Sequence, residues 1–392
     1  MLKYLMIFLL SFSFLASYEG FVRTKGKILI DANGREFFII GVNLGNWLLP
    51  EGYMWQFSST TVDRPRRIEK MIVDLIGEEK AKIFWKKYRD NYITEKDIEL
   101  ISKIGFNAVR VPINCRLFIG ENSTSLKEEG FYYLDRLIEW CKKYGLFVVI
   151  DLHAAPCGQT GANIDDSLND KPELFLNENY EKMTVYLWRE IAYRYRNEKA
   201  VLAYDLLNEP LPAKDENHTL YKELEPLYKK ITKAIREVDK NHIITIEGAN
   251  WATDFGVFGA PFDSNLLYQF HKYWNKTDEE SIKPFLEFRD RYNVPVWCGE
   301  TGENNNEWYK ENFKLLKKNN IGWAFWPWKK LYAFNCPYSI KFPSGWGKII
   351  NFARYGTKLS QEEAEKIFAS FLENLLIENC DYNEPVVKAI FF

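Results

Sequence analysis

Short apolar runs rich in β-branched and aromatic residues alternate with helical patterns along most of the chain. Each run is nearly continuous in apolar character and most end in a polar residue. The runs cover residues 37–43, 108–113, 147–153, 201–209, 243–248, 266–271, 295–300 and 322–328. Such runs are typical of strands that are buried on both faces, as in a parallel sheet covered by helices.

Amphipathic helical stretches separate most of these runs. Residues 94–104 and 132–144 place apolar residues at helical spacing, and Thr94 with Asp97 three positions later indicates a helix start. Glycines follow both stretches as stop signals, at Gly105 and Gly145. Residues 360–376 predict a closing amphipathic helix.

The alternation of strands and helices predicts the fold class. Eight strand–helix units in one chain favour a closed barrel over an open doubly wound sheet, and no glycine-rich GxGxxG turn supports the open sheet. We therefore predict an α/β protein built as a single (β/α)8 TIM barrel. No linker or internal repeat divides the chain, so we expect residues 18–392 to form one domain.

The first 17 residues predict a targeting signal. Lys3 precedes an apolar stretch at residues 4–16, and the small residues Ala16 and Ser17 follow before polar Glu19. This stretch is shorter than an ordinary membrane span, and no later stretch reaches about 18 apolar residues. We expect a signal peptide at 1–17, no membrane span in the mature chain, and a secreted, lumenal or periplasmic protein. A signal anchor is the alternative.

The charges are nearly balanced. The chain has 52 Lys and Arg against 54 Asp and Glu, a net charge of −2, without a long run of one sign. A nucleic-acid partner requires a basic surface, so we expect none. Aromatic residues make up 16% of the chain, which indicates either an aromatic core or a surface that stacks on flat apolar ring faces.

The six cysteines contain no CxxC pair, which argues against a zinc site. They are Cys115, Cys141, Cys157, Cys298, Cys336 and Cys380. Disulfides are possible in a secreted chain, but spacing does not determine their connectivity. Asn122, Asn217 and Asn275 begin glycosylation sequons, which carry little weight because such tripeptides are common by chance.

Two glutamates end predicted strands. Glu209 closes the fourth run and Glu300 closes the seventh, and these strands face each other across the mouth of a closed barrel. A carboxylate pair about 5 to 5.5 Å apart serves a retaining glycosidase, and about 6.5 to 9.5 Å an inverting one. Asn208 and Pro210 flank Glu209, so that an amide lies beside the acid and the proline turns the chain away from the strand.

Other polar and aromatic residues end strands at the same face. They are Arg110, His153, His271, Tyr273 and Trp326. Two of the four histidines lie at this face, which favours ligand contact over a purely structural role. No HExxH motif or paired spacing occurs, so we expect no metal.

These residues resemble glycoside hydrolase family 5, the cellulase-type (β/α)8 retaining hydrolases. The segments that carry the resemblance are GFNAVRVP at 105–112, DLH at 151–153, LNEP at 207–210, HKY at 271–273, Glu300 and Trp326. The exo-β-1,3-glucanase branch is the most similar, through GVNLGNWL at 41–48, YITEKDI at 92–98 and DLHAAPCGQTG at 151–161. Residues 301–309 and 329–347 do not match that branch. The resemblance therefore does not identify the glycosidic linkage that is cleaved.

The resemblance implies roles for the site residues. Glu300 would be the nucleophile and Glu209 the acid and later the base of a double displacement. Arg110 and Tyr273 would hold Glu300 ionised. Further roles are sugar binding by Asn208 and His153, orientation of the carboxylates by His271, and a stacking platform at Trp326.

Other residues are weaker candidates for substrate contact. Trp47, Trp55, Trp251 and Trp274 either stack on sugars or pack in the core and at the barrel rim. Asp165 and Asp166 either bracket a terminal glucose, which would make the enzyme exo-acting, or form a solvated turn.

We predict a secreted retaining β-glycosidase that acts on a β-glucan or β-glucoside, as a monomer and without a cofactor. The alternatives are a glycosylceramidase-like glycolipid hydrolase, an endo-β-1,4-glucanase with the same machinery and, more remotely, a carbohydrate-binding barrel without activity. Aromatic residues between 321 and 346 would supply the apolar groove that a glycolipid needs.

Overall fold

The structure is a computed structural model that describes residues 18–213 and 218–392. The predicted signal peptide at 1–17 and the sequon residue Asn217 lie outside the described residues. Within the described part, no helix combines the length and the apolar character that crossing a bilayer requires.

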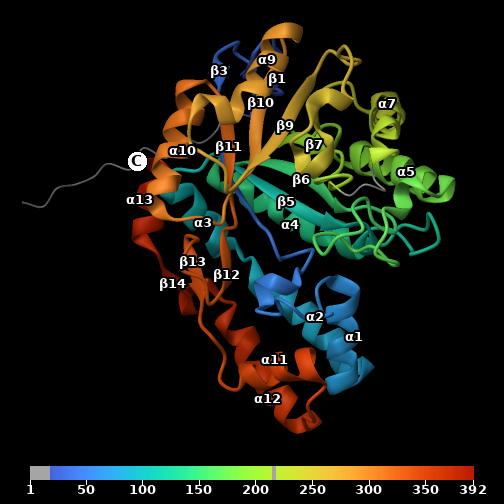
Figure 1. Cartoon of the computed structure of the whole chain (residues 1–392), viewed down its shortest axis with the longest axis vertical. Coiled ribbons are helices and arrows are strands. Elements are labelled where there is room, and N and C mark those ends of the chain that lie inside the picture. Colours follow the sequence, from blue (N-terminus) through green and yellow to red (C-terminus); the bar gives the residue numbers. More distant parts are fainter. Residues whose placement is uncertain (1–17, 214–217) are drawn as a thin grey trace, which may run out of the picture.

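A closed barrel of parallel strands forms the centre of the molecule (Figure 1). Its strands are β4 (Ile40–Asn43), β5 (Ala108–Asn114), β6 (Phe147–Ala154), β7 (Val201–Asp205), β8 (Ile243–Glu247), β9 (Leu266–Lys272), β10 (Val296–Gly302) and β11 (Gly322–Trp326). Their order around the ring is β10-β11-β4-β5-β6-β7-β8-β9. All eight predicted strands are present, which confirms the barrel. One boundary differs: β7 ends at Asp205, so Asn208 and Glu209 lie in the loop beyond it.

Helices follow most of the strands and cover the outside of the barrel. They are α3 (Glu95–Ile104), α4 (Glu128–Tyr144), α5 (Glu178–Tyr195), α7 (Tyr221–Val238), α9 (Lys283–Tyr292) and α10 (Asn306–Lys318). Strand β8 is followed only by the short α8 (Ala249–Ala252) and a 3-10 turn at Phe255–Val257. The predicted start and stop signals are confirmed, because Thr94 and Asp97 form a capping box on α3 and Gly105 and Gly145 adopt the left-handed conformation.

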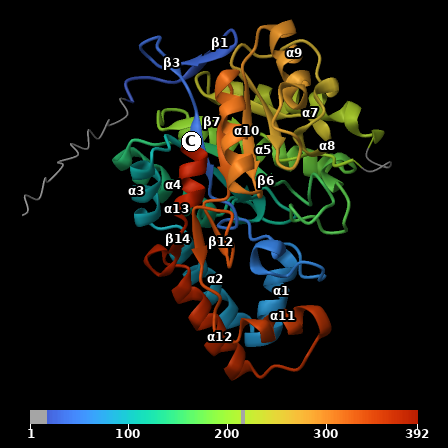
Figure 2. The same ribbon diagram turned by 60° about the vertical axis from the view of Figure 1, so that its left-hand side comes forward.

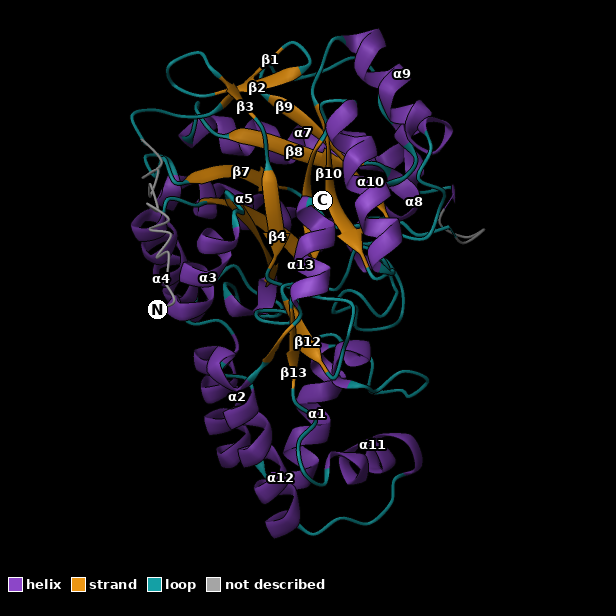
Figure 3. Ribbon diagram, turned by 90° about the vertical axis from the view of Figure 1, so that its left-hand side faces the viewer, coloured by secondary structure: helices purple, strands orange, loops and turns teal. Residues whose placement is uncertain are grey.

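A small antiparallel sheet covers the amino-terminal end of the barrel. It consists of β1 (Arg23–Lys25), β2 (Ile28–Ile30) and β3 (Glu36–Phe37), and Figure 3 shows it at the end of the barrel opposite to α11 (Trp346–Tyr355) and α12 (Gln361–Asn374). Its residue Leu29 belongs to one apolar cluster with Ala108 and Trp297 at the barrel floor. This end is therefore closed by packing, and the opposite end carries the loops.

A helical lobe extends from the loop-bearing end of the barrel (Figure 2). It contains α1 (Pro65–Ile76), α2 (Glu78–Tyr92), α11 (Trp346–Tyr355) and α12 (Gln361–Asn374). A sheet of β12 (Lys329–Leu331), β13 (Tyr338–Ile340) and β14 (Asp381–Tyr382) joins it to β11. The predicted helix at 360–376 is present as α12, but it packs on α1 and α2 because Phe368 and Phe371 contact the rings of Phe84 and Trp55. The last helix, α13 (Glu384–Phe391), lies against α10 instead.

The six cysteines all lie in the described part of the chain and are free thiols there. Five are buried and Cys380 is partly buried, so they pack as small apolar residues.

Candidate active site

A cavity of about 610 Å³ lies among the loops that follow the carboxyl ends of the barrel strands. Its lining residues come from both the predicted site and loops outside it: Glu51, Tyr53, His153, Asn163, Ile164, Glu209, Trp251, Thr253, His271, Tyr273, Trp274, Asn275, Glu300, Glu303 and Trp326. Both predicted acids therefore face one cavity.

The two glutamates converge within this cavity. A carboxylate oxygen of Glu209, one of Glu300 and a ring nitrogen of His271 all lie within 4.8 Å of one another. His271 Nδ1 is 2.7 Å from Glu209 Oε1 and 3.5 Å from Glu300 Oε2. The carboxylate separation matches the short class, about 5 to 5.5 Å, in which one acid attacks the sugar directly. It leaves too little room for a water molecule between the sugar and a second acid.

The loop after β7 holds Glu209 in an uncommon backbone conformation. Its φ is +42°, in the left-handed region that non-glycine residues rarely adopt. The amide of Glu209 donates to Glu247 Oε2 at 2.7 Å, and Gln159 Nε2 donates to the carbonyl of Asn208 at 2.9 Å. These contacts hold the main chain at Asn208 and Glu209, and they direct the carboxyl group of Glu209 into the cavity.

A β-bulge at Gly299 sets the direction of Glu300. The register of β10 shifts relative to β9 between Cys298 and Glu300, and bulges re-aim side chains next to active sites. Gly299 is required there because a Cβ would collide with the side chain of Gln269. Glu300 then receives two hydrogen bonds, from Tyr273 Oη to Oε2 at 2.6 Å and from Arg110 Nη1 to Oε1 at 2.5 Å.

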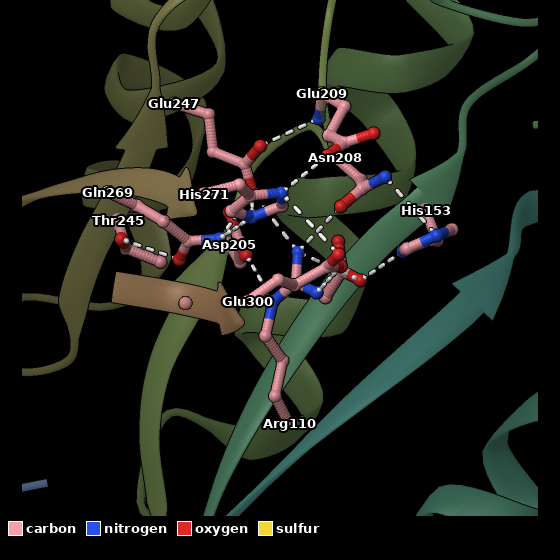
Figure 4. A network of polar contacts seen from close by, with 12 residues as sticks. Arg110, His153, Asp205, Asn208, Glu209, Thr245, Glu247, Gln269, His271 and Glu300 are labelled. Carbon is pink, nitrogen blue, oxygen red and sulfur yellow. Dashed lines mark hydrogen bonds and ion pairs between the residues drawn. The ribbon is translucent and has the colours of Figure 1, made fainter. Parts of the chain in front are cut away.

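Arg110 is the centre of a buried charge cluster beneath the cavity (Figure 4). Its guanidinium contacts four carboxylates, from Asp151 at 3.1 Å, Asp205 at 2.8 Å, Glu247 at 3.0 Å and Glu300 at 2.5 Å. A guanidinium suits this place because it remains charged when buried and donates in several directions. Three of its four carboxylate partners, Asp151, Asp205 and Glu247, were not among the predicted site residues.

The surroundings move the pKa values of the two glutamates in opposite directions. Burial raises the pKa of Glu209, and the nearby charge of Glu300 adds to the increase against the opposing effect of His271. Burial alone would also raise the pKa of Glu300, but the charges of His271 and Arg110 outweigh it and lower the value. Two acids with separated pKa values are typical of an acid and nucleophile pair. Glu209 is thus suited to hold a proton and Glu300 to remain ionised.

The pKa of His271 is raised well above its usual value. Burial opposes the increase, but the carboxylates of Glu247 and Glu300 together with the hydrogen bond to Glu209 outweigh it. His271 therefore carries a positive charge between the two acids. This charge favours the ionised form of Glu300.

These shifts predict a bell-shaped dependence of kcat/KM on pH. Activity requires ionised Glu300, so it is lost as the pH falls through the lowered pKa of that residue. Activity also requires protonated Glu209, so it is lost as the pH rises through the raised pKa. The measurement is kcat/KM against pH for the wild type and Glu209→Gln with an aryl β-glucoside of intermediate reactivity, whose leaving group benefits from the acid but departs measurably without it. The variant should keep the acid limb and lose the alkaline limb; an unchanged alkaline limb would assign it to another group.

Three predicted sugar-binding residues lie together, and two of them, His153 and Trp326, line the cavity. The rings of His153 and Trp326 are parallel, with centroids 5.6 Å apart, and Asn208 Nδ2 is 3.2 Å from His153 Nε2. The indole of Trp326 donates to Tyr53 Oη at 2.8 Å. The ring edge of Trp326 lies against Gly45, where a Cβ would displace it. Trp326 is thus fixed as a flat surface in the cavity.

Two of the four stacking candidates, Trp47 and Trp55, lie outside the cavity lining. Trp47 is buried, donates to the carbonyl of Arg89 and packs on Tyr133. Trp55 lies in the aromatic core of the lobe. Of the four stacking candidates, Trp251 and Trp274 line the cavity, and Trp274 is 77% exposed.

Asp165 and Asp166 are buried and hold a loop instead of facing the cavity. Asp165 accepts hydrogen bonds from the amides of Thr160 and Ser167, at 2.8 and 2.9 Å. Asp166 is bonded to the Arg66 amide at 2.9 Å and to Asn114 and Arg116. The structure thus gives both carboxylates protein partners, and the loop that they fix presents Asn163 and Ile164 to the cavity.

Several cavity residues had no distinct signal in the sequence. Glu51 is 2% exposed, and its Oε1 has no hydrogen-bond partner among the described residues. Glu303, which also lines the cavity, forms an ion pair with Lys330 at 2.7 Å. These residues lie on loops, where apolar periodicity gives no guidance. Glu247, which contacts Arg110 and does not line the cavity, is different because it lies at the end of a predicted strand as Glu209 and Glu300 do.

By distance alone, Glu209, His271 and Glu300 are a set of described residues that would surround a small cation. Their contacts do not favour one. His271 Nδ1 is already paired with Glu209, and the Arg110 guanidinium and the Tyr273 hydroxyl bond to the oxygens of Glu300. A positive guanidinium at this distance opposes a second cation.

Comparison with known proteins agrees with the geometry of the site. A family model described as cellulase, glycosyl hydrolase family 5, matches residues 72–331, which is more than half of the chain. A β-xylosidase of Phanerodontia chrysosporium is 27% identical over 80% of this chain and 71% of its own length. Endoglucanase C of Acetivibrio thermocellus is 29% identical over 64% of this chain and 88% of its own length. A sporulation-specific glucan 1,3-β-glucosidase of Saccharomyces cerevisiae is 33% identical over 54% of this chain and 49% of its own length.

Proposed function

The chain belongs to glycosyl hydrolase family 5 and is a glycoside hydrolase of β-glucans, and on this premise we propose that it is a retaining enzyme that releases glucose from the ends of β-1,3-linked chains. The observation that carries the retaining mechanism is the separation of at most 4.8 Å between oxygens of Glu209 and Glu300. We further propose that it is secreted as a monomer, with the sequence of residues 1–17 in support of secretion.

The first step forms a glycosyl-enzyme. Glu300 attacks the anomeric carbon with a carboxylate oxygen, and the bond to the leaving oxygen breaks. Glu209 transfers its proton to that oxygen, so the leaving group departs as an alcohol. Arg110 and Tyr273 bond to the oxygens of Glu300 and orient the attack. Glu209 is left as a carboxylate next to the positive charge of His271.

The second step regenerates the enzyme. Water enters the place of the leaving group and gives a proton to Glu209, while its oxygen bonds to the anomeric carbon and the ester to Glu300 breaks. Two inversions at one carbon leave the product with the β configuration of the substrate. No step requires a metal or an organic cofactor, because the two carboxyl groups and water account for every atom transferred.

Release from chain ends is supported by the residues that line the cavity. Glu51 and Glu303 follow β4 and β10, which lie on either side of β11, and Trp251 lies across the barrel after β8. Glu51 is buried, and the ion pair with Lys330 holds Glu303, whose side chain is 16% exposed. Two carboxylates in the cavity lining are suited to accept hydrogen bonds from the hydroxyl groups of a terminal sugar.

The ion pair joins two segments that depart from the exo-β-1,3-glucanase branch. Glu303 lies in the departing segment 301–309 and Lys330 in the departing segment 329–347. They meet in the structure with Lys330 Nζ at 2.7 Å from both oxygens of Glu303. The two departing segments therefore meet at the lining of the cavity, where Glu303 contributes a carboxylate.

The proposed activity predicts the products formed from polymeric substrates. The protein spanning residues 18–392 is incubated with laminarin, lichenan, cellulose oligomers and a glycosylceramide, and product length and anomeric form are followed from the first minutes. We expect glucose as the main early product from laminarin, in the β form before mutarotation. Products of mixed length from cellulose oligomers would instead assign the endo-β-1,4-glucanase activity, which similarity to endoglucanase C favours.

The glycosylceramide arm tests a glycolipid substrate. Tyr332, Phe334 and Phe342 form an exposed aromatic group with ring centroids 5.3 to 5.4 Å apart. They lie within residues 321–346, the segment expected to supply an apolar groove. Faster cleavage of glycosylceramide than of laminarin would replace the glucan assignment.

A further inference from the structure

Glu247 has no role in the reaction as written, yet its carboxylate touches the groups that hold both acids (Figure 4). It is the last residue of β8 and is fully buried. Its Oε2 accepts from the amide of Glu209 at 2.7 Å, and its Oε1 lies 3.0 Å from Arg110 Nη2 and 3.3 Å from His271 Nε2. Gln269 Nε2 also donates to Oε1.

Three of these partners, the Glu209 amide, the Arg110 guanidinium and the Gln269 side-chain amide, are hydrogen-bond donors. An ionised carboxylate accepts from all of them because it has about four lone-pair directions and no hydrogen. A glutamine of the same shape has one oxygen and one NH₂ group. Either orientation of that amide sets its NH₂ against a donor, the Glu209 amide in one case and Arg110 with Gln269 in the other. The site therefore requires a carboxylate, and the isosteric amide does not satisfy it.

The main chain of Glu247 is fixed as well. Tyr228 Oη donates to the carbonyl of Glu247 at 2.9 Å, so the residue is held from helix α7. Glu247 thus supports Glu209 in two ways. It binds the amide of a residue whose φ is +42°, and it orients His271, which bonds to the Glu209 carboxyl at 2.7 Å.

We propose that Glu247 is a positioning residue for the acid step, holding both the backbone and the carboxyl group of Glu209 in line with the leaving oxygen. This inference rests on the proposed function. Glu247 does not contact the substrate, since it does not line the cavity. The loss of kcat/KM on substitution of Glu247 should therefore depend on how much acid assistance the substrate needs.

The test compares leaving groups in the Glu247→Gln variant. The value of kcat/KM is measured for an alkyl β-glucoside, which needs a proton from Glu209, and for 2,4-dinitrophenyl β-glucoside, which does not. We expect a loss of about 100-fold on the alkyl substrate, the typical result of misplacing a catalytic group by about 1 Å. The loss on the dinitrophenyl substrate should be less than about tenfold, because nucleophilic attack by Glu300 needs no acid there.

Thr245→Val is the matched control. Thr245 lies two residues earlier on β8, is fully buried and contacts Gln269 at 3.5 Å, but it does not contact Glu209. This variant should keep the same ratio between the two substrates as the wild type. Glu247→Asp keeps the charge with a shorter reach and should lie between the wild type and Glu247→Gln. If thermal unfolding shows that Glu247→Gln does not fold, the comparison of the two substrates is made with Glu247→Asp instead.

Equal losses on both substrates, or no loss on either, would overturn the positioning role while leaving the proposed function intact. A wild type that cleaves no β-glycoside would remove the proposed function and this inference together.

Discussion

Glu300→Gln should remove turnover while leaving the protein folded. Glutamine keeps the shape of the side chain but lacks the charge that attacks the anomeric carbon, so no glycosyl-enzyme forms. Loss of a catalytic nucleophile costs about 10⁴- to 10⁶-fold in kcat. The measurement is kcat on an aryl β-glucoside together with the thermal unfolding curve. We expect the curve to retain a single cooperative transition.

The cavity supplies a matched control for this substitution. Glu303 lies three residues further along the chain and also lines the cavity, but its oxygens bond to Lys330 and not to Arg110 or Tyr273. Glu303→Gln should reduce activity far less than Glu300→Gln. Activity of Glu300→Gln within tenfold of the wild type would show that another residue is the nucleophile.

Glu209→Gln should give a loss that depends on the leaving group. The variant has no proton to donate, so kcat/KM for an alkyl β-glucoside should fall by about 10²- to 10⁴-fold. The 2,4-dinitrophenyl substrate should react with Glu300 almost normally. Its glycosyl-enzyme should then accumulate, because Glu209 is also the base that activates water in the second step. Pre-steady-state kinetics should show a burst of dinitrophenolate followed by slow turnover.

Asn208→Asp provides a control beside Glu209. Asn208 accepts a hydrogen bond from Arg110 Nη2 at 2.9 Å and, unlike Glu209, is not among the residues that line the cavity. Its substitution should affect alkyl and dinitrophenyl substrates alike. If Glu209→Gln showed the same uniform loss, Glu209 would not be the acid.

The barrel and the two acids could be predicted because both follow from strand periodicity. Buried parallel strands give continuous apolar runs, and the polar residues that end those runs converge at one mouth. His271 and Glu300 lie near such ends, whereas Arg110 lies within β5, and the three side chains meet in the structure. Glu247 lies at an equivalent end. The sequence does not reveal its importance, because the three donors around its carboxylate, from Glu209, Arg110 and Gln269, are distant from it in the chain.

The loop residues could not be placed by the same logic. Asp165 was expected in the cavity as one possibility, but its burial and its bonds to main-chain amides depend on how the loop folds back. Glu51 and Tyr53 reach the cavity because the segment after β4 is packed against the aromatic lobe, where Trp346 donates to the carbonyl of Trp55 at 3.1 Å. The lobe itself assembles helices that are distant in the sequence, and helical periodicity does not show which helices pair.

Trapping of the covalent intermediate tests the central claim most directly, namely that Glu209 and Glu300 act on one anomeric carbon as acid and nucleophile. A 2-deoxy-2-fluoro-β-glucoside with a dinitrophenyl leaving group forms the ester quickly and loses it slowly, because fluorine destabilises the oxocarbenium-like transition state of both steps. After proteolysis, mass spectrometry locates the label. We predict one label per chain, on Glu300. A label on Glu209, or steady turnover of ordinary substrates that yields the α anomer first, would contradict the account.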